Sequence, residues 1–232
     1  MNVYFFSGLG ADKTVFQFLD LSFCNPVFIE WITPLKNEAL ESYALRLKEH
    51  YQIPDNAIIA GLSFGGMLAT ELAKKYPALR VIIISSAKTK YELPRFYQLG
   101  KYITMHSWTP AVLQRWFMLN TKMLFSLKTP EYIKVYEELI KRSDTNFNKW
   151  AVGALLHWGN TMIPSNIKHI HGTHDKILPY KYVSCNYTVN GGGHLMVMEQ
   201  AAITSKLILD IIVNEAATLS SSASQPAHLL RG

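Results

Sequence analysis

The stretch IIAGLSFGGML, residues 58–68, passes from an apolar run through a serine flanked by glycines into a segment of helical character. Its pattern G-x-S-x-G is weak alone, since roughly one chain in twelve of this length would match by chance. The setting is informative, because a tight strand-to-helix turn imposes strained backbone angles on its serine and needs glycine nearby. We predict that the turn lifts the Ser63 hydroxyl above a sheet, whereas the alternative is that Gly65 and Gly66 only permit close packing.

Short apolar runs alternate with helical segments along most of the chain. The expected strands, rich in β-branched or aromatic residues and bounded by turn residues, lie at 3–6, 26–31, 57–60, 80–84, 167–171 and 184–189. In residues 37–51, Leu40, Tyr43 and Leu47 recur at the spacing of one helix face. This alternation predicts an α/β fold with a mostly parallel sheet of about six strands, which binds ligands at the carboxyl ends of its strands.

The alternation stops between Arg95 and about Asn160, where helical-looking segments carry four of the five tryptophans. A structureless loop of this length is implausible within a compact domain, so we expect residues 93–160 to form a helical cap. The core would then comprise residues 1–92 and 161–215, and the serine-rich residues 216–232 would form a flexible tail.

A cap over a ligand site needs an apolar underside, which makes its tryptophans candidates for a substrate pocket. We single out Trp116 and Trp158, although such side chains could equally fill the core of the insertion itself. An uncharged substrate is expected, because few charged side chains are available there to bind a carboxylate or phosphate, unless Arg95, Lys101 or Arg115 points inward.

Composition and charge argue against several functional classes. With 49% hydrophobic and 17% charged residues, the chain is typical of a globular protein. The net charge of +6 comes from scattered lysines, so no nucleic-acid partner is expected. Cys24 and Cys185 match no metal or redox spacing, and we expect no metal and two free thiols. No apolar run approaches the ~20 residues of a membrane span and no secretory leader is apparent, so we expect a cytoplasmic protein without a membrane partner.

A serine nucleophile requires a general base and an acid that orients the base. His194 follows the last expected strand in the glycine-rich NGGGHLMV, residues 190–197. Asp175 follows the preceding strand in HGTHDKILP, residues 171–179, and should reach the same sheet edge. Glu92 is a second candidate acid, and Asp175 alone could instead be a turn or helix-capping residue.

The other histidines are weaker candidates for the base. His169 and His171 share one face of an expected strand, where packing in the core or at the surface explains them better. His174, next to Asp175, is expected to point the other way.

Ser63, Asp175 and His194 occur in the order nucleophile, acid, base, each on a loop after a separate strand. On these motifs, residues 3 to about 214 resemble the serine hydrolases of the α/β-hydrolase superfamily. GLSFGG resembles the nucleophile elbow, HGTHDKILP the acid loop and GGGHLMV the histidine loop. The resemblance implies an α/β-hydrolase fold with a helical cap, lacking the first strands of the family because the chain begins almost directly at the strand before the oxyanion loop.

The resemblance also implies an oxyanion hole formed by two backbone N–H groups. Leu9, within FFSGLGADKTVF (residues 5–16), is expected to provide one, and Phe64 the other. Many family members have His-Gly where this chain has Ser7-Gly8. Because the donor is a main-chain group, the difference affects the hydrogen bonding of the loop more than its function.

The predicted activity is therefore that of a carboxylesterase-like serine hydrolase, which cleaves small-to-medium uncharged acyl esters through an acyl-enzyme and uses no cofactor. Three alternatives stay open: a thioesterase, a C–C bond hydrolase or lyase with the same triad, and a non-hydrolytic ligand-binding protein on this fold.

Overall fold

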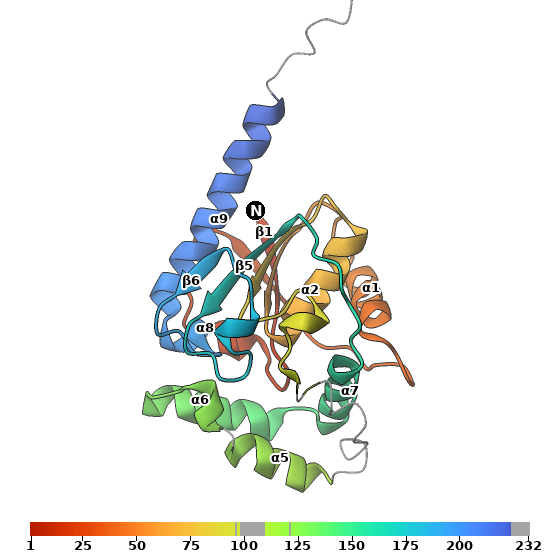
Figure 1. Ribbon diagram of the computed structural model, residues 1–232, viewed down its shortest axis with the longest axis vertical. Helices are drawn as coiled ribbons and strands as arrows, with labels where there is room; N and C mark the ends of the chain where they lie inside the picture. Colours follow the sequence, from red (N-terminus) through yellow and green to blue (C-terminus); the bar gives the residue numbers. More distant parts are fainter. Residues whose placement is uncertain (96, 98–109, 121, 224–232) are drawn as a thin grey trace, which may run out of the picture.

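The computed structural model describes residues 1–95, 97, 110–120 and 122–223. Within them, one six-stranded sheet has the order β2-β1-β3-β4-β5-β6, and every neighbouring pair is parallel (Figure 1). The strands are β1 (Asn2–Phe6), β2 (Asn25–Ile29), β3 (Ile58–Leu62), β4 (Arg80–Ile84), β5 (Ile167–Gly172) and β6 (Tyr187–Val189). The predicted α/β architecture with a parallel sheet of about six strands is thus confirmed.

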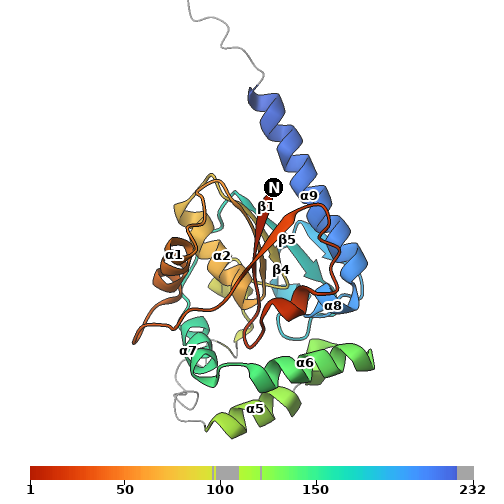
Figure 2. The same ribbon diagram turned by 180° about the vertical axis from the view of Figure 1, so that it is seen from behind.

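Helices cover both faces of the sheet, which explains why its strands read as continuous apolar runs. Helices α1 (Leu40–His50) and α2 (Phe64–Lys75) lie on one face, and α8 (Met196–Glu199) and α9 (Ala201–Ala223) lie on the other (Figure 2). All five residues of β3 are buried. Ile59 joins the core on the side of α1 and α2, while Ile58 and Ala60 join the core on the side of α9.

Among the described residues between β4 and β5, the chain forms three helices: α5 (Ala111–Asn120), α6 (Pro130–Arg142) and α7 (Thr145–Leu156). They lie across the end of the sheet at which the strands terminate (Figure 1). The α6 side chains Leu139 and Ile140 pack into one core, and Phe147 of α7 packs into the other. The insertion is thereby attached to both layers of the fold.

Two strands are shorter than the sequence predicts. Strand β2 ends at Ile29, opposite Phe6, because its partner β1 also ends there. Beyond it, the backbone of Ile32 bonds with the Tyr43 hydroxyl instead of a strand. Strand β6 begins at Tyr187 because the backbone groups of Ser184 are engaged by side chains.

The last helix is longer than expected. We expected a flexible tail from residue 216, but α9 continues to Ala223. Helix propagation costs little once a packed segment has nucleated it, and the serine-rich composition does not prevent it. The remainder of that expected tail, residues 224–232, lies outside the described residues. No helix in the described part of the chain has both the length and the apolar character of a membrane span.

The four shorter elements are 3-10 turns: η1 (Lys13–Phe16), η2 (Lys90–Glu92), η3 (Lys122–Phe125) and η4 (Tyr180–Tyr182). Turns η1, η2 and η4 follow the ends of β1, β4 and β5, and η3 belongs to the insertion. Turn η1 also packs against α6 and α8.

The first turn of α2 packs unusually close to β1 and β3. A Cβ added to Gly65 would lie 2.3 Å from the Ser7 carbonyl oxygen and 2.4 Å from that of Phe6. A Cβ on Gly61 would lie 2.6 Å from the Gly65 carbonyl oxygen. These approaches require glycine, since backbone atoms of a central strand cannot move aside cheaply.

Replacing Gly65 with alanine is expected to lower the free energy of unfolding by about 2 kcal/mol, because the new methyl group overlaps backbone oxygens. Urea denaturation measures the change. Gly159→Ala is the matched control, because a Cβ there has no heavy atom within 4 Å. Equal midpoints for Gly65→Ala and the unmodified protein would contradict the close packing described here.

Candidate active site

Ser63 occupies the turn between β3 and α2 in a strained conformation. Its φ of 51° and ψ of −116° lie in a region that non-glycine residues rarely adopt, at a typical cost of about 1–3 kcal/mol. Two hydrogen bonds hold it there: its N–H donates to the Ile84 carbonyl at 2.9 Å, and the Ser86 hydroxyl donates to its carbonyl at 2.7 Å. Residues at the end of β4 and just beyond it thus hold Ser63 in its strained conformation.

The Ser63 side chain is half-buried and begins a hydrogen-bonded chain of three residues. His194 Nε2 lies 2.8 Å from Ser63 Oγ, and His194 Nδ1 lies 2.8 Å from Asp175 Oδ2. A carboxylate only accepts hydrogen bonds, so the proton of neutral His194 resides on Nδ1. Nε2 is then free to accept the Ser63 hydroxyl proton. The structure therefore brings together the three side chains that the sequence singled out.

Asp175 is buried on the loop that follows β5, and its two oxygens have separate partners. Oδ1 accepts the backbone N–H groups of Ile177 and Leu178, each at 2.8 Å, while Oδ2 faces His194. Burial raises the pKa of Asp175, but His194 and the Leu178 N–H outweigh it, so the pKa lies below its usual value. The acid is therefore held ionised beside the imidazole.

The loop after β1 lies directly beside Ser63. The Ser7 hydroxyl donates to the Ala11 carbonyl at 2.8 Å, and the Trp31 indole N–H donates to the same oxygen at 3.3 Å. A Cβ placed on Gly8 would lie 3.6 Å from the Ser63 Cβ. The Ser7 hydroxyl is thus hydrogen-bonded within its own loop, and this bond accounts for a serine at the position.

The two backbone N–H groups expected to form an oxyanion hole belong to this loop and to the elbow. Leu9 lies in the loop, and Phe64 is the first residue of α2, where helical N–H groups lack intrahelical acceptors. Within the described part of the chain, neither N–H has a hydrogen-bond acceptor. Both donors are therefore left unpaired by the fold.

Aromatic side chains surround the elbow. Trp31 stacks on Phe147 with ring centroids 5.3 Å apart, and Phe64 meets the edges of Phe147 and Trp150 at 6.2 and 6.0 Å. On the other side, the Phe125 ring lies 5.7 Å from the His194 ring. The aromatic side chains that pack against Phe64 and His194 therefore come from both the core and the insertion.

No family model and no curated protein sequence matches the chain. Solved structures do: an esterase from Thermogutta terrifontis superposes with a TM-score of 0.71 at 17% identity, over 92% of this chain and 90% of that one. An esterase from Exiguobacterium antarcticum gives 0.70 at 13% identity, over 90% and 91%. A meta-cleavage product hydrolase from Pseudomonas fluorescens IP01 gives 0.65 at 19% identity, over 93% and 91%. The chain has the α/β-hydrolase fold.

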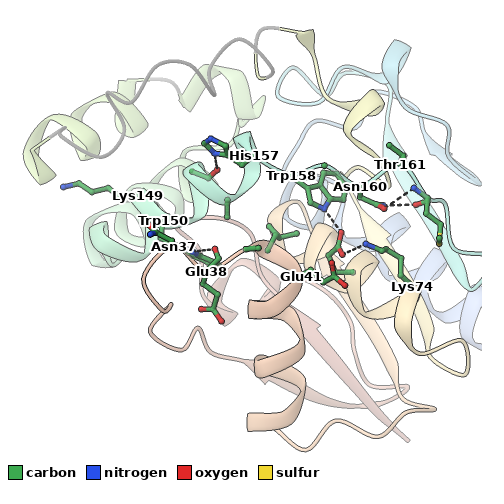
Figure 3. A pocket seen from close by; sticks show the side chains of 17 residues that line it. Asn37, Glu38, Glu41, Lys74, Lys149, Trp150, His157, Trp158, Asn160 and Thr161 are labelled. Carbon is green, nitrogen blue, oxygen red and sulfur yellow. Dashed lines mark hydrogen bonds and ion pairs between the residues drawn. The ribbon is translucent and has the colours of Figure 1, made fainter.

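Within this α/β-hydrolase fold, the two tryptophans expected at the substrate pocket differ in exposure. Trp116 on α5 is 59% exposed. Trp158 is buried because its indole N–H finds an acceptor in Glu71 at 2.6 Å, and Glu71 lies two turns along α2 from Ser63. Trp158 lines a cavity of about 910 Å³ between α1, α2 and the end of α7, and none of the residues that line it belongs to the Ser63 chain (Figure 3).

The alternative acid, Glu92, has partners other than His194. Glu92 is buried, but its oxygens accept the N–H groups of Lys88 and Ser184. Arg95 is exposed, whereas Lys101 and the side chain of Arg115 lie outside the described residues. Among the described residues, no group of three or more His, Cys, Asp or Glu side chains is arranged to hold a metal ion.

Sequence reasoning overlooked two residues that support the site, Ser86 and Trp31. The signal for Ser86 was present, since Ser85-Ser86 directly follows the apolar β4 and so reaches the same sheet edge as Ser63. Trp31 stands two residues beyond β2 at that edge, but its range was assigned to the strand itself.

Two further histidines of the α/β-hydrolase core are fully buried on β5. His169 Nε2 lies 3.1 Å from His171 Nδ1. Burial, the adjacent His171 and the Lys88 charge hold the pKa of His169 well below its usual value. Burial likewise lowers the pKa of His171, although the Asp175 charge opposes the shift. By contrast, His174 is exposed.

This pair should make the protein less stable in mild acid. The unfolded chain protonates both residues near pH 6.5, while the folded chain resists protonation. Stability is then fully present above pH 6.5 and is lost as the pH falls toward the depressed folded values, by about 1 kcal/mol or more between pH 7.5 and 5.5. Urea denaturation at both pH values measures the loss, which His169→Phe should reduce. A free energy of unfolding that is constant over this range would contradict the assignment.

Proposed function

We propose that the protein is a serine hydrolase that cleaves uncharged, small-to-medium acyl esters, a carboxylesterase-like activity. The observation that carries the proposal is the chain of two 2.8 Å contacts from Ser63 through His194 to Asp175. The similarity in fold to esterases from two organisms supports the same reaction class. The aromatic rings that pack against Phe64 and His194, the neighbours of Ser63, favour an uncharged acyl group.

In the proposed reaction, Ser63 Oγ attacks the acyl carbonyl carbon and His194 Nε2 takes its proton. The resulting imidazolium is stabilised by Asp175, which is already ionised and hydrogen-bonded to Nδ1. His194 then returns the proton to the leaving alcohol. Because all three groups are within hydrogen-bond reach before substrate arrives, little reorganisation is needed for the first proton transfer.

The N–H groups of Leu9 and Phe64 would bind the tetrahedral oxyanion, and one such donor typically contributes about 3 kcal/mol to transition-state stabilisation. The second half of the reaction repeats the proton transfers with water in place of the alcohol. Water, activated by His194 Nε2, attacks the acyl-enzyme and releases the carboxylic acid from Ser63.

Ser63→Ala is expected to abolish turnover of p-nitrophenyl esters from acetate to decanoate, because no other hydroxyl of the described residues contacts His194 Nε2. Its free energy of unfolding should stay within about 1 kcal/mol of the unmodified protein. Ser42→Ala, at an exposed serine on α1, is the matched control and should retain full rates. Full activity in Ser63→Ala would refute the proposal, and the chain-length optimum of the unmodified protein measures the acyl pocket.

The same assay separates the other candidates. Ser63-dependent turnover of thioesters or of C–C substrates, but not of oxygen esters, would assign one of those activities instead. The structural similarity to a meta-cleavage product hydrolase makes meta-cleavage products the C–C substrates to include. A ligand that raises the melting temperature without any turnover would indicate a binding protein.

Asp175→Asn is expected to lower kcat by about 10⁴-fold, because the amide favours the wrong tautomer of His194. Glu92→Gln is the matched control, since Glu92 is equally buried but bonds to Lys88 and Ser184 rather than to His194. Steady-state rates of the folded fraction should therefore separate the two variants. An unchanged rate in Asp175→Asn, with a large loss in Glu92→Gln, would transfer the role of the acid to Glu92.

A further inference from the structure

The acid loop is anchored to the sheet by a buried histidine that takes no part in the reaction proposed above. His171 Nε2 lies 2.8 Å from the Leu178 carbonyl oxygen. Leu178 belongs to the same loop as Asp175 and donates its own N–H to Asp175 Oδ1 at 2.8 Å. Leu178 is thus hydrogen-bonded to His171 through its carbonyl oxygen and to Asp175 through its N–H.

The partners fix which nitrogen of His171 carries the proton. A carbonyl oxygen can only accept, so the His171 proton resides on Nε2. Its Nδ1 is then an acceptor, and His169 Nε2 at 3.1 Å must be the donor to it. His169 Nδ1 then carries no proton. This agrees with the structure, in which the buried Nδ1 atom has no hydrogen-bond partner among the described residues. The two neutral rings therefore form a hydrogen-bond chain with a single direction.

Because its proton is on Nε2, His171 directs an N–H group toward the Asp175 carboxylate. His171 Nε2 lies 3.6 Å from Asp175 Oδ2, the oxygen that also accepts His194 Nδ1–H. The distance is too long for a hydrogen bond, but a buried N–H dipole at this range acts strongly on a charge because little solvent screens it. His171 therefore offsets part of the negative potential that Asp175 exerts on His194.

We propose that His171 is a positioning residue: its Nε2–H fixes the acid loop through Leu178 and moderates the charge of Asp175, and so sets the pH range in which His194 acts as a base. The inference rests on the proposed function, because it assigns His194 the role of the base. It concerns neutral His171, which acts only through Asp175 and does not touch the reacting atoms.

Several other titratable groups face this cluster. Those around His171 are His169 on its own strand, Asp175 and Tyr180 from the following segment, His194 and Glu92. The positive charge of Lys88 lowers the pKa of His169. Tyr97 faces Asp175, and burial with the Asp175 charge raises the pKa of Tyr97 to about 12, so it stays neutral throughout the assay range.

Removing the N–H should move the acid limb of the pH profile upward. In His171→Phe, the ring keeps its approximate shape but no dipole opposes Asp175, so the imidazolium form of His194 becomes more favourable. The acid limb of kcat/KM for p-nitrophenyl esters should shift by about half to one pH unit toward higher pH. A loosened acid loop should also lower kcat about tenfold.

Two companion variants distinguish this role from a merely structural one. In His171→Gln, the amide nitrogen can take the place of Nε2 and donate to Leu178, so the acid limb should return to within about 0.2 pH units of the unmodified protein. His169→Phe removes an equally buried histidine from the same strand, but one that does not face Asp175. It should leave the acid limb in place even where stability falls. Equal shifts in His171→Phe and His169→Phe, or none in either, would overturn the proposal.

A further measurement needs no turnover, and its first part uses the unmodified protein. Nitrogen-15 NMR of the histidine rings should find His171 neutral with the proton on Nε2 at pH 7, and protonation on Nδ1 would overturn the inference. The His194 titration, followed by the same spectra in His171→Phe, should show the upward shift directly. If no ester is hydrolysed but this shift is present, the proposed function fails while the role of His171 stands.

Discussion

The close approach of the first turn of α2 to the ends of β1 and β3 is the constraint on which the site depends. Gly61 and Gly65 allow backbones to meet at distances that any side chain would prevent. Ser63 then has no relaxed conformation, and its positive φ is maintained by hydrogen bonds from Ser86 and to Ile84. One packing requirement thus fixes the hydroxyl, the start of the helix and the adjoining loop after β1 together.

The rest of the site is joined to this elbow by loops from distant parts of the chain. Asp175 remains ionised although buried, because His194 and two backbone N–H groups compensate for the lost water. A buried carboxylate without them would take up a proton instead. The acid loop, the histidine loop and strand β5 therefore form one polar network, whose parts stabilise each other only when all are in place.

The sequence was sufficient to predict the strands and the sheet edge that carries the site, but not the contacts between individual side chains. Continuous apolar runs such as residues 80–84 predicted buried parallel strands, and motif order placed Ser63, Asp175 and His194 at one sheet edge. Alternation also put His169 and His171 on one face. It could not reveal the partner of His171, because spacing along a strand determines a side chain's face and not the loop that folds over it. The partner of Trp158 could not be predicted for the same reason: its indole N–H is satisfied by Glu71, which only the packed structure brings near.

The helical insertion leaves the sheet after β4 and returns at β5, and these strands are direct neighbours. Its two ends are therefore held close together by the core itself, whatever lies between them. Since the entropy of closing a loop grows only slowly with its length, this position tolerates segments of very different size. Evolution could exchange the insertion as a module and so change which molecules reach Ser63, while the elbow and the polar network beneath it stayed the same.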